Sequence, residues 1–359
     1  MNPFEELPLR DDLRGREPYG APDLDAPVRL DSNENPHQLP DEVADAVEKS
    51  LHAVIRDLNR YPDREALALR EDLASYLGHG LTAANVWAAN GSNEIHQQLL
   101  QAFAGPGRNA MGFEPSYPMH PIIAANTGTS WLDARRTNFE LTLSHAKAQV
   151  RVFQPDVVFV CSPNNPTGAS VDLEVIEGIA SEAPGMVIVD EAYAEFARDS
   201  AESAITLLPR FHRLVVVRTM SNAFALAGAR VGYLAANPRV IDAIRLVRLP
   251  YHLSSLTQAA ARAALAHAPL LLAQVDAIKA ERDRIVVGLR ELGLTAVDSD
   301  ANFVLFGRFK DAQGVQQALL ERGVLVREVG LDGHLRVTAG TTAETDAFLA
   351  AVGAVPHGA

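Results

Sequence analysis

Three short apolar runs in the middle of the chain constrain the fold most. They cover residues 157–160, 186–189 and 214–217, and they are rich in β-branched side chains. Segments with helical spacing of apolar residues separate them. Buried strands that alternate with helices are typical of a parallel sheet covered on both faces. The sequence therefore predicts an α/β fold.

The flanking regions predict how the chain is divided. Residues 1–30 are rich in Pro, Gly, Asp and Arg without periodicity, and we expect an N-terminal arm that becomes ordered by lying on another surface, such as a neighbouring subunit. Residues 31–250 should form a large domain. Residues 251–359 should form a smaller C-terminal α/β domain, hinged to it by a long helical tract from about residue 256 to residue 292.

Further elements are expected from local patterns. Apolar residues at helical spacing predict a helix from Asp41, and Asp63 should cap a second helix that runs to about Leu77 and ends at Gly78. In the C-terminal part we expect strands at 302–306, 324–327 and 334–338, and a helix near 315–322.

The composition disfavours several functions. The chain has 32 basic and 45 acidic residues, so a nucleic-acid partner is not expected. Cys161 is the only cysteine, which excludes an intrachain disulfide and a cysteine-based zinc cluster. No apolar stretch approaches the ~20 residues that a membrane span needs, and the first residues lack a signal-peptide pattern. We expect a cytoplasmic protein that does not bind membranes.

Polar clusters follow the apolar strands, at the position where open α/β sheets bind ligands. Residues 90–94, Asn-Gly-Ser-Asn-Glu, open a helix whose free N–H groups suit a phosphate. Residues 162–168 follow the strand that ends at Cys161, and two prolines there fix the position of Asn165.

Two more clusters follow the next two strands. Asp190 ends a buried strand, so it needs a partner such as a protonated ring nitrogen, a backbone N–H or an arginine. Residues 218–230 bring two hydroxyl groups and Arg230 near one strand end, which is enough to bind a phosphate dianion.

Taken in order, these motifs resemble the cofactor-binding sequence of class II aminotransferases, which use pyridoxal 5'-phosphate (PLP). The motifs are S-P-N-N-P-T-G at 162–168, V-D-E-A-Y at 189–193 and T-M-S-N-A-F-A-L-A-G-A-R-V-G-Y at 219–233. Segments at 30–36, 59–63, 90–94, 325–328 and 334–340 are similar to the histidinol-phosphate branch. The resemblance covers nearly the whole chain. It implies the fold-type I architecture, with a mostly parallel seven-stranded sheet between helices.

The resemblance also implies roles in holding the cofactor. Asp190 would pair with the ring nitrogen, Asn165 and Tyr193 with the ring oxygen, and Tyr117 would stack on the ring. The phosphate would be held by Ser92, Asn93, Thr219, Ser221 and Arg230, and by Tyr61 from the partner subunit. The implied assembly is a homodimer with shared active sites.

The implied substrates are small molecules. Tyr19, Asn33 and Asn93 would face the substrate, and Arg327 and Arg336 would clamp its carboxylate or phosphate. In the histidinol-phosphate branch, the reaction converts L-histidinol phosphate and 2-oxoglutarate into imidazole acetol phosphate and glutamate, in histidine biosynthesis. An aromatic amino-acid aminotransferase shares the cofactor pocket and remains an alternative. Asn93 and the two arginines favour the phosphate-bearing substrate.

The chain departs from the family at one catalytic position. The family has its Schiff-base lysine after Ser221, where this chain has Asn222. An amide nitrogen can neither form that bond nor move a proton, because its lone pair is delocalised. The four lysines, Lys49, Lys147, Lys279 and Lys310, lie outside the motifs. We therefore expect non-covalent PLP and severely impaired or absent turnover. The other anchors are kept, so Asn222 indicates a recent loss, a deliberate exchange, or a modified lysine read as asparagine.

The sequence leaves one other class of protein open and disfavours two more. A non-catalytic protein that binds PLP or substrate is an alternative in which Asn222 is the intended residue. A nicotinamide dehydrogenase is disfavoured because no strand is followed by G-x-G-x-x-G. Metal hydrolysis is disfavoured because no H-E-x-x-H motif occurs, and no metal is expected. His96 lies one turn before Leu99, where the family usually has an apolar residue, and the sequence assigns it no role.

Overall fold

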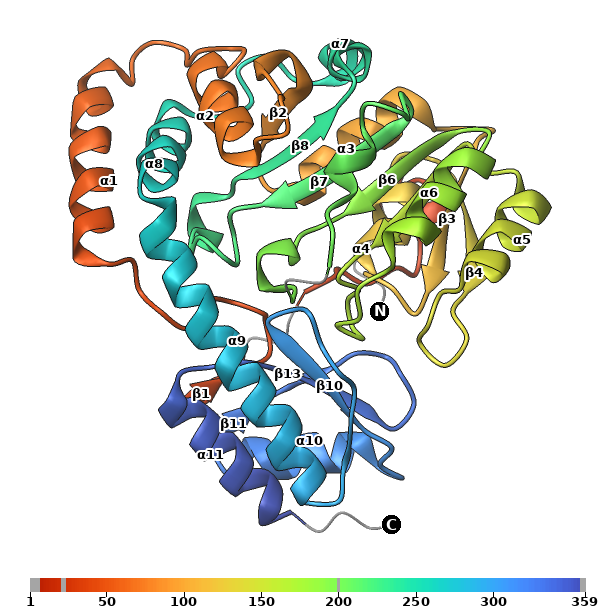
Figure 1. Ribbon diagram of the computed structural model, residues 1–359, viewed down its shortest axis with the longest axis vertical. Coiled ribbons are helices and arrows are strands. Elements are labelled where there is room, and N and C mark those ends of the chain that lie inside the picture. Colours follow the sequence, from red (N-terminus) through yellow and green to blue (C-terminus); the bar gives the residue numbers. More distant parts are fainter. Residues whose placement is uncertain (1–6, 21–23, 199–200, 356–359) are drawn as a thin grey trace.

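A seven-stranded sheet forms the centre of the larger part of the molecule (Figure 1). In the computed structural model, which describes residues 7–20, 24–198 and 201–355, its strand order is β2-β8-β7-β6-β5-β3-β4. Neighbouring strands are parallel, except that β8 is antiparallel to both β2 and β7. The predicted mostly parallel sheet is confirmed. The strands are β2 (Val86–Ala89), β3 (Asn109–Glu114), β4 (Ser130–Arg135), β5 (Val157–Cys161), β6 (Met186–Asp190), β7 (Leu214–Thr219) and β8 (Gly232–Ala236).

Helices cover both faces of this sheet, because successive residues of each strand point to opposite sides. Val158 and Val160 join one hydrophobic cluster, while Val157 and Phe159 join the other. The first cluster is covered by α2 (Leu67–Leu77), α5 (Leu143–Phe153), α6 (Leu173–Glu182) and α8 (Ser255–Ala266). The second is covered by α3 (Ser92–Phe103), α4 (Met119–Asn126) and α7 (Pro238–Val247).

The two helices expected before the sheet are present, with one corrected boundary. The first, α1 (Asp41–Val54), begins at Asp41 as predicted, and α2 ends at Gly78 as predicted. The prediction that α2 starts just after Asp63 was wrong. Ala66 has a φ of +46°, which does not fit an α-helix, so α2 begins at Leu67. Asp63 instead accepts hydrogen bonds from the backbone N–H groups of Glu65 and Leu67 in the preceding turn.

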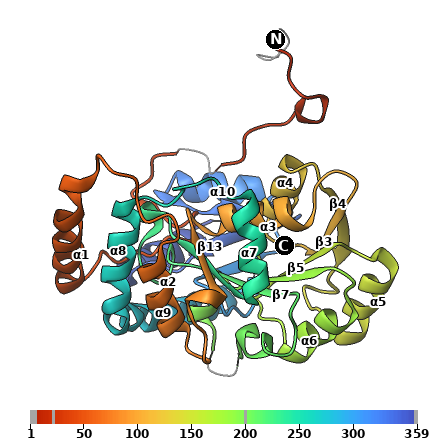
Figure 2. The same cartoon turned by 90° about the horizontal axis from the view of Figure 1, so that it is seen from above.

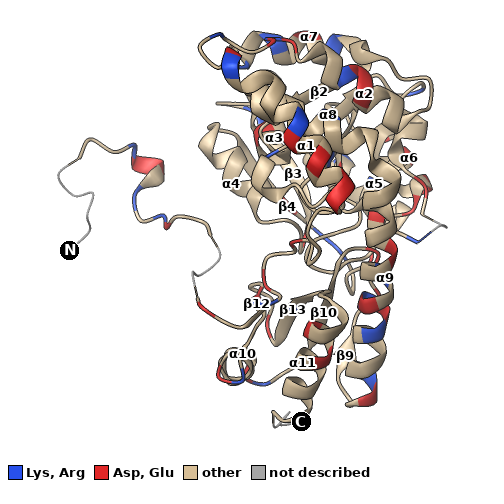
Figure 3. Ribbon diagram, turned by 90° about the vertical axis from the view of Figure 1, so that its left-hand side faces the viewer, with Lys and Arg blue, Asp and Glu red and all other residues tan. Residues whose placement is uncertain are grey.

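A long helix, α9 (Ala268–Glu291), connects the central sheet to the C-terminal part of the chain (Figure 1). The predicted helical tract from about 256 to 292 is confirmed, except that it consists of two helices, because α8 ends at Ala266 and α9 begins at Ala268. Pro269 accounts for the break: a proline fits the first turn of a helix but not its interior. One side of α9 buries Leu271, Val275 and Ile278, and Figure 3 shows acidic and basic residues along its length.

The C-terminal part contains a four-stranded sheet in the order β12-β13-β10-β9. It also contains α10 (Ala312–Leu320) and α11 (Thr342–Gly353), and the strands are β9 (Thr295–Ala296), β10 (Phe303–Gly307), β12 (Arg327–Glu328) and β13 (His334–Thr338). The strands and the helix predicted here are confirmed within a few residues, except that the run at 324–327 forms two short strands. The first of these, β11 (Val324–Leu325), belongs to another sheet.

The N-terminal region joins the C-terminal one. The strand β1 (Val28–Arg29) pairs in parallel with β11, and the backbone of Leu30 bonds to Leu325 and Thr338. Before it, the segment that contains η1 (Asp11–Leu13) extends away from the rest of the molecule (Figure 2). The domain limits after residues 30 and 250 stay a prediction. No described helix is long and apolar enough to cross a membrane.

Short 3-10 helices complete the described chain. They are η2 (Ile55–Asp57), η3 (Ala83–Asn85), η4 (Ala194–Phe196), η5 (Ala204–Leu207) and η6 (Ala227–Ala229).

Candidate functional site

Two adjoining cavities lie at the ends of β5, β6 and β7, where the sequence places its polar clusters. The smaller, of about 250 Å³, brings together most of the expected cofactor residues: Ser92, Asn93, Tyr117, Asp190, Tyr193, Thr219, Ser221, Asn222 and Arg230. The larger, of about 730 Å³, is lined by the expected substrate residues Tyr19, Asn33, Arg327 and Arg336, and by Asn165. Ser32, Asn33, Tyr117 and Tyr193 line both, so the two cavities share a wall.

A cradle for an anion forms one end of the smaller cavity. The helix α3 begins at Ser92 directly after Gly91, whose φ is +85°. This φ favours glycine, and a side chain at Gly91 would also displace the guanidinium of Arg230. Arg230 lies in the left-handed region, and its Nη1 donates to Ser221 Oγ at 3.4 Å. Free N–H groups of a helix start, two hydroxyls and a guanidinium are the donors that a phosphate group needs.

Tyr193 and Tyr117 line the wall shared by the two cavities. The Tyr193 hydroxyl accepts hydrogen bonds from Asn33 Nδ2 at 2.9 Å and Asn165 Nδ2 at 3.4 Å. Burial raises the pKa of Tyr193 to about 12, so its phenol keeps its proton at neutral pH. Burial likewise raises the pKa of Tyr117. Both rings therefore enter the site as neutral aromatic groups.

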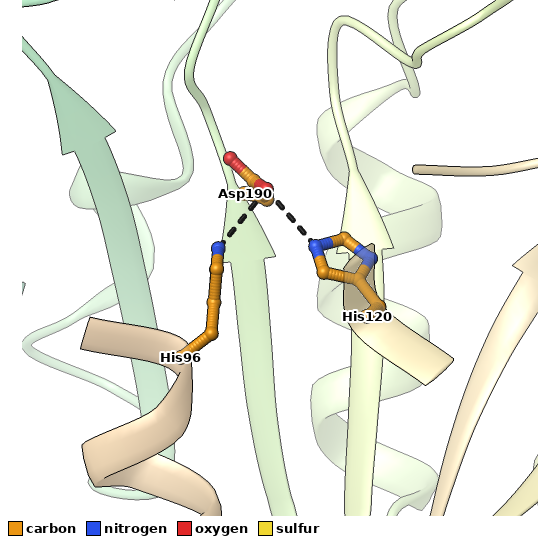
Figure 4. A group of neighbouring side chains, drawn as sticks. All are labelled: His96, His120 and Asp190. Atoms are coloured by element: carbon orange, nitrogen blue, oxygen red, sulfur yellow. Dashed lines mark hydrogen bonds and ion pairs between the residues drawn. The ribbon is translucent and has the colours of Figure 1, made fainter. Parts of the chain in front are cut away.

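Asp190 ends β6 and is held by two histidines (Figure 4). Its Oδ2 lies 3.1 Å from His96 Nε2 and 3.0 Å from His120 Nε2, and all three side chains are buried. Burial alone would raise the pKa of Asp190, but the hydrogen bonds that both histidines donate hold it below its usual value. The carboxyl group is thus ionised at neutral pH.

Sequence reasoning missed both histidines. His96 was assigned no role, and His120 was not singled out. A signal was present for His96, because Ile95, Leu99 and Leu100 share its side of α3 and are buried. A histidine among buried apolar neighbours needs a polar partner, and that requirement would have predicted a contact with the sheet.

Asn222 occupies the wall of the smaller cavity, near Asp190 and Tyr193. Its backbone carbonyl accepts a hydrogen bond from Asn35 Nδ2 at 3.0 Å. All four lysines lie in the described part of the chain, and none of them lines either cavity. Among the described residues, no lysine therefore lies at the cavities to supply the amine that Asn222 cannot provide.

Three arginines line the larger cavity, Arg135, Arg327 and Arg336, together with the acidic residues Asp31, Glu114, Asp133 and Glu328. Arg336, on β13, donates from Nη1 to Asn165 Oδ1 at 2.7 Å and from Nη2 to the Asp31 carbonyl at 2.8 Å. Burial lowers the pKa of Arg336, and its buried Nε has no hydrogen-bond partner among the described residues. Arg327, on β12, donates to the Gly20 carbonyl at 3.2 Å. Arg327 Nη1, like Arg336 Nε, is buried without a hydrogen-bond partner in the described chain, so these two guanidinium groups favour an anionic ligand.

Of the residues expected to bind the cofactor, Tyr61 alone lines neither cavity. Its side chain is 80% exposed and stacks on Tyr251 with ring centroids 4.5 Å apart. The role expected for it concerns a neighbouring subunit, and stays a prediction.

The residues of the smaller cavity fit PLP. The site offers an ionised acid for the ring nitrogen, an aromatic face, and a cationic cradle for the phosphate. Asn93 Oδ1 is also buried there without a hydrogen-bond partner in the described chain. When bound, PLP supplies an aldehyde that takes up an amino group and a ring that withdraws electrons from the substrate. Asp190 would keep the proton on the ring nitrogen, and Tyr117 would orient the ring.

Comparisons with known proteins agree with this geometry. Residues 26–352 match the family described as aminotransferase class I and II. Histidinol-phosphate aminotransferase of Frankia casuarinae is 59% identical, over 97% of this chain and 90% of that protein, and that of Thermobifida fusca is 57% identical, over 96% and 94%.

Two solved structures of aminotransferases are also similar to this chain. The crystal structure of histidinol-phosphate aminotransferase from Sinorhizobium meliloti in complex with pyridoxal-5'-phosphate superposes with a TM-score of 0.83 at 26% identity, covering 92% of this chain and 90% of that one. Aspartate aminotransferase from Thermus thermophilus with maleate has a TM-score of 0.79 at 25% identity, over 92% and 91%. The chain therefore belongs to the PLP-dependent class I and II aminotransferases, in their histidinol-phosphate aminotransferase branch.

Proposed function

We propose that this chain binds PLP without a covalent link and recognises histidinol phosphate, but transaminates it slowly or not at all. The observation that carries the proposal is Asn222, which lines the cofactor cavity where the family has a lysine. The remaining polar groups of the cavity can still bind the ring and the phosphate. What is missing is an amine that can hold the aldehyde and move a proton.

In this proposal, different residues of the chain would bind the cofactor and the substrate. Arg230, Ser221 and Thr219 would bind the cofactor phosphate, and Asp190 would hold the proton on the ring nitrogen. Arg327 and Arg336 would bind the substrate's anionic group in the larger cavity. The names of the relatives support histidinol phosphate as one substrate, and the family resemblance implies 2-oxoglutarate as the other.

Restoring the lysine tests the proposal. We expect Asn222→Lys to give a yellow protein that transaminates histidinol phosphate and 2-oxoglutarate. The unaltered chain should be slower by at least about 10²–10⁴-fold, the usual contribution of general acid–base catalysis, because covalent activation is lost as well. Steady-state assays of both proteins with added PLP measure this. Asn222→Gln is the matched control, since it lengthens the side chain without adding an amine. Equal rates for the lysine variant and the unaltered chain would refute the proposal.

The substrate class has its own test. Because Arg327 and Arg336 line the larger cavity and each has an unused buried donor, we expect the PLP-loaded chain to bind histidinol phosphate more tightly than phenylalanine. Titration of each ligand against the cofactor absorbance compares them. Arg327→Gln should reduce the preference for the phosphate-bearing ligand. A preference for phenylalanine in the unaltered chain would instead favour an aromatic amino-acid aminotransferase.

We also propose that the chain acts as a cytoplasmic homodimer. The exposed Tyr61 supports this, since it stacks on Tyr251 outside the chain's own cavities. A second copy would bring Tyr61 to the cofactor phosphate, and the N-terminal arm would lie on that copy. The buried, unpaired Cys161 fits a reducing compartment.

A further inference from the structure

The two histidines on Asp190 meet the same oxygen atom. His96 from α3 and His120 from α4 both place Nε2 within hydrogen-bond distance of Oδ2 (Figure 4). The other oxygen, Oδ1, accepts a hydrogen bond from the backbone N–H of Ala192 at 3.1 Å. Asp190 lines the cofactor cavity, whereas neither histidine does. The histidines therefore contact the carboxylate from outside the cavity that Asp190 lines.

This arrangement fixes which groups donate. An ionised carboxylate can only accept hydrogen bonds, so both Nε2 atoms must carry protons. The Nδ1 atoms of His96 and His120 are buried and have no hydrogen-bond partner in the described chain. A second proton on either ring would bury an unsatisfied N–H, which is costly. Each imidazole is therefore a neutral Nε2–H donor, and burial also lowers the pKa of His120.

The same three side chains lie close enough to hold a metal ion. Histidines that bind metals usually donate their second ring N–H to an acceptor, which orients the ring. Neither Nδ1 has such an acceptor among the residues that the structure describes. The cluster is therefore better explained as two donors and one carboxylate.

We propose that His96 is a positioning residue for the cofactor: with His120 it occupies Oδ2 of Asp190, so that Oδ1 is the atom that meets the ring nitrogen. The inference rests on the proposed PLP site. It adds a second histidine to the support of Asp190, at a position where the resemblance implies an apolar residue. In a chain with Asn222 no covalent bond helps to retain the cofactor, so the Asp190 contact carries a larger share of the affinity.

Two ligands and two variants test the role of His96. The ligands are pyridoxamine 5'-phosphate and its 1-deaza analogue, in which a C–H replaces the ring nitrogen. We expect His96→Leu to weaken pyridoxamine 5'-phosphate about tenfold, as for the loss of one hydrogen bond to a charged group, and the analogue less than about twofold. His96→Gln keeps an N–H donor and should retain most of the preference for the ring nitrogen. Isothermal titration calorimetry on the full chain measures all six affinities.

The possible outcomes are distinct. If His96→Leu weakens both ligands equally or neither, His96 has only a packing role and the inference is wrong, while the cofactor site stands. If the unaltered chain binds neither ligand, the proposed function fails together with the inference. Nitrogen-15 NMR of the unaltered chain needs no variant: His96 and His120 should both show a proton on Nε2, and a proton on Nδ1 of His96 would overturn the inference.

Discussion

Arg230 illustrates how a single residue defines the cofactor site. It adopts a left-handed backbone conformation directly after η6, and this turns its guanidinium towards Gly91 and Ser221. The side chain thereby joins residues from two loops into one anion cradle. Its planar group can bind two phosphate oxygens at once, which a lysine cannot do.

The phosphate role of Arg230 can be separated from its structural role. We expect Arg230→Gln to weaken pyridoxamine 5'-phosphate about tenfold or more, since charge-assisted hydrogen bonds are lost. Pyridoxamine, which has no phosphate, should bind both proteins almost equally. Calorimetry with the two ligands gives the comparison, and Arg230→Lys should lie between the two proteins. A similar loss for both ligands would argue against a phosphate contact.

The sequence predicted which residues line the site, but it did not predict which side chains form hydrogen bonds with them. The motifs located Asp190, Asn222 and Arg230 because their spacing relative to strand ends is local. The partners of Asp190 are 94 and 70 residues away in the sequence, on α3 and α4. Spacing within one helix says which side of it is buried, but not which strand that side meets. The His96 contact therefore needed the three-dimensional structure.

At the scale of elements, the cofactor cradle depends on a close approach between β8 and the turn before α3. A side chain at Gly232, the first residue of β8, would collide with the backbone of Gly91 and Ser92. The strand and the turn can touch because that position has no Cβ. The turn that we propose to bind the phosphate is thus held directly against the sheet.

Gly232→Ala should therefore destabilise the protein. Overpacking against backbone costs about 1–3 kcal/mol, because backbone moves less easily than a side chain. Gly228→Ala is the matched control, since a Cβ at Gly228 meets no atom within 4 Å, and it should change stability by less than about 0.5 kcal/mol. Denaturant unfolding of the apo proteins measures both. Equal stability of the two variants would show that the contact is not tight.

Element boundaries were less predictable than element types. The strands were found from their composition, whereas the start of α2 and the break between α8 and α9 were not. Ala66 has no sequence feature that announces a positive φ. Pro269 does signal a break, but the apolar periodicity on both sides of it favoured a continuous helix. Tertiary packing decided both cases.

At the scale of the whole molecule, two exposed apolar segments support a dimer. Tyr61 and Tyr251 stack on each other, and Leu58 and Leu249 are exposed two or three residues away along the chain. A stacked pair of aromatic rings beside exposed leucines is typical of an interaction surface. The Tyr61 role inferred from the family requires this surface to face the second active site.

Leu249→Glu should weaken the dimer. A charge in an apolar interface must be desolvated without a partner, so we expect monomers at low micromolar concentration, together with weaker binding of pyridoxamine 5'-phosphate. Analytical ultracentrifugation measures the assembly. Val152→Glu on α5 is the control, because Val152 and Leu249 are similarly exposed, at 77% and 74%. Monomers in the unaltered chain would exclude the shared site.

The pairing of β1 with β11 also determines when the site can form during synthesis. Asp31 and Asn33 line the larger cavity, and they are held by Arg336 and Thr338, some 305 residues later. The last strand of the central sheet, β8, ends at Ala236, whereas Arg336 and Thr338 lie on β13 near the end of the chain. The larger cavity, which includes Arg327 and Arg336, can therefore be completed only near the end of translation.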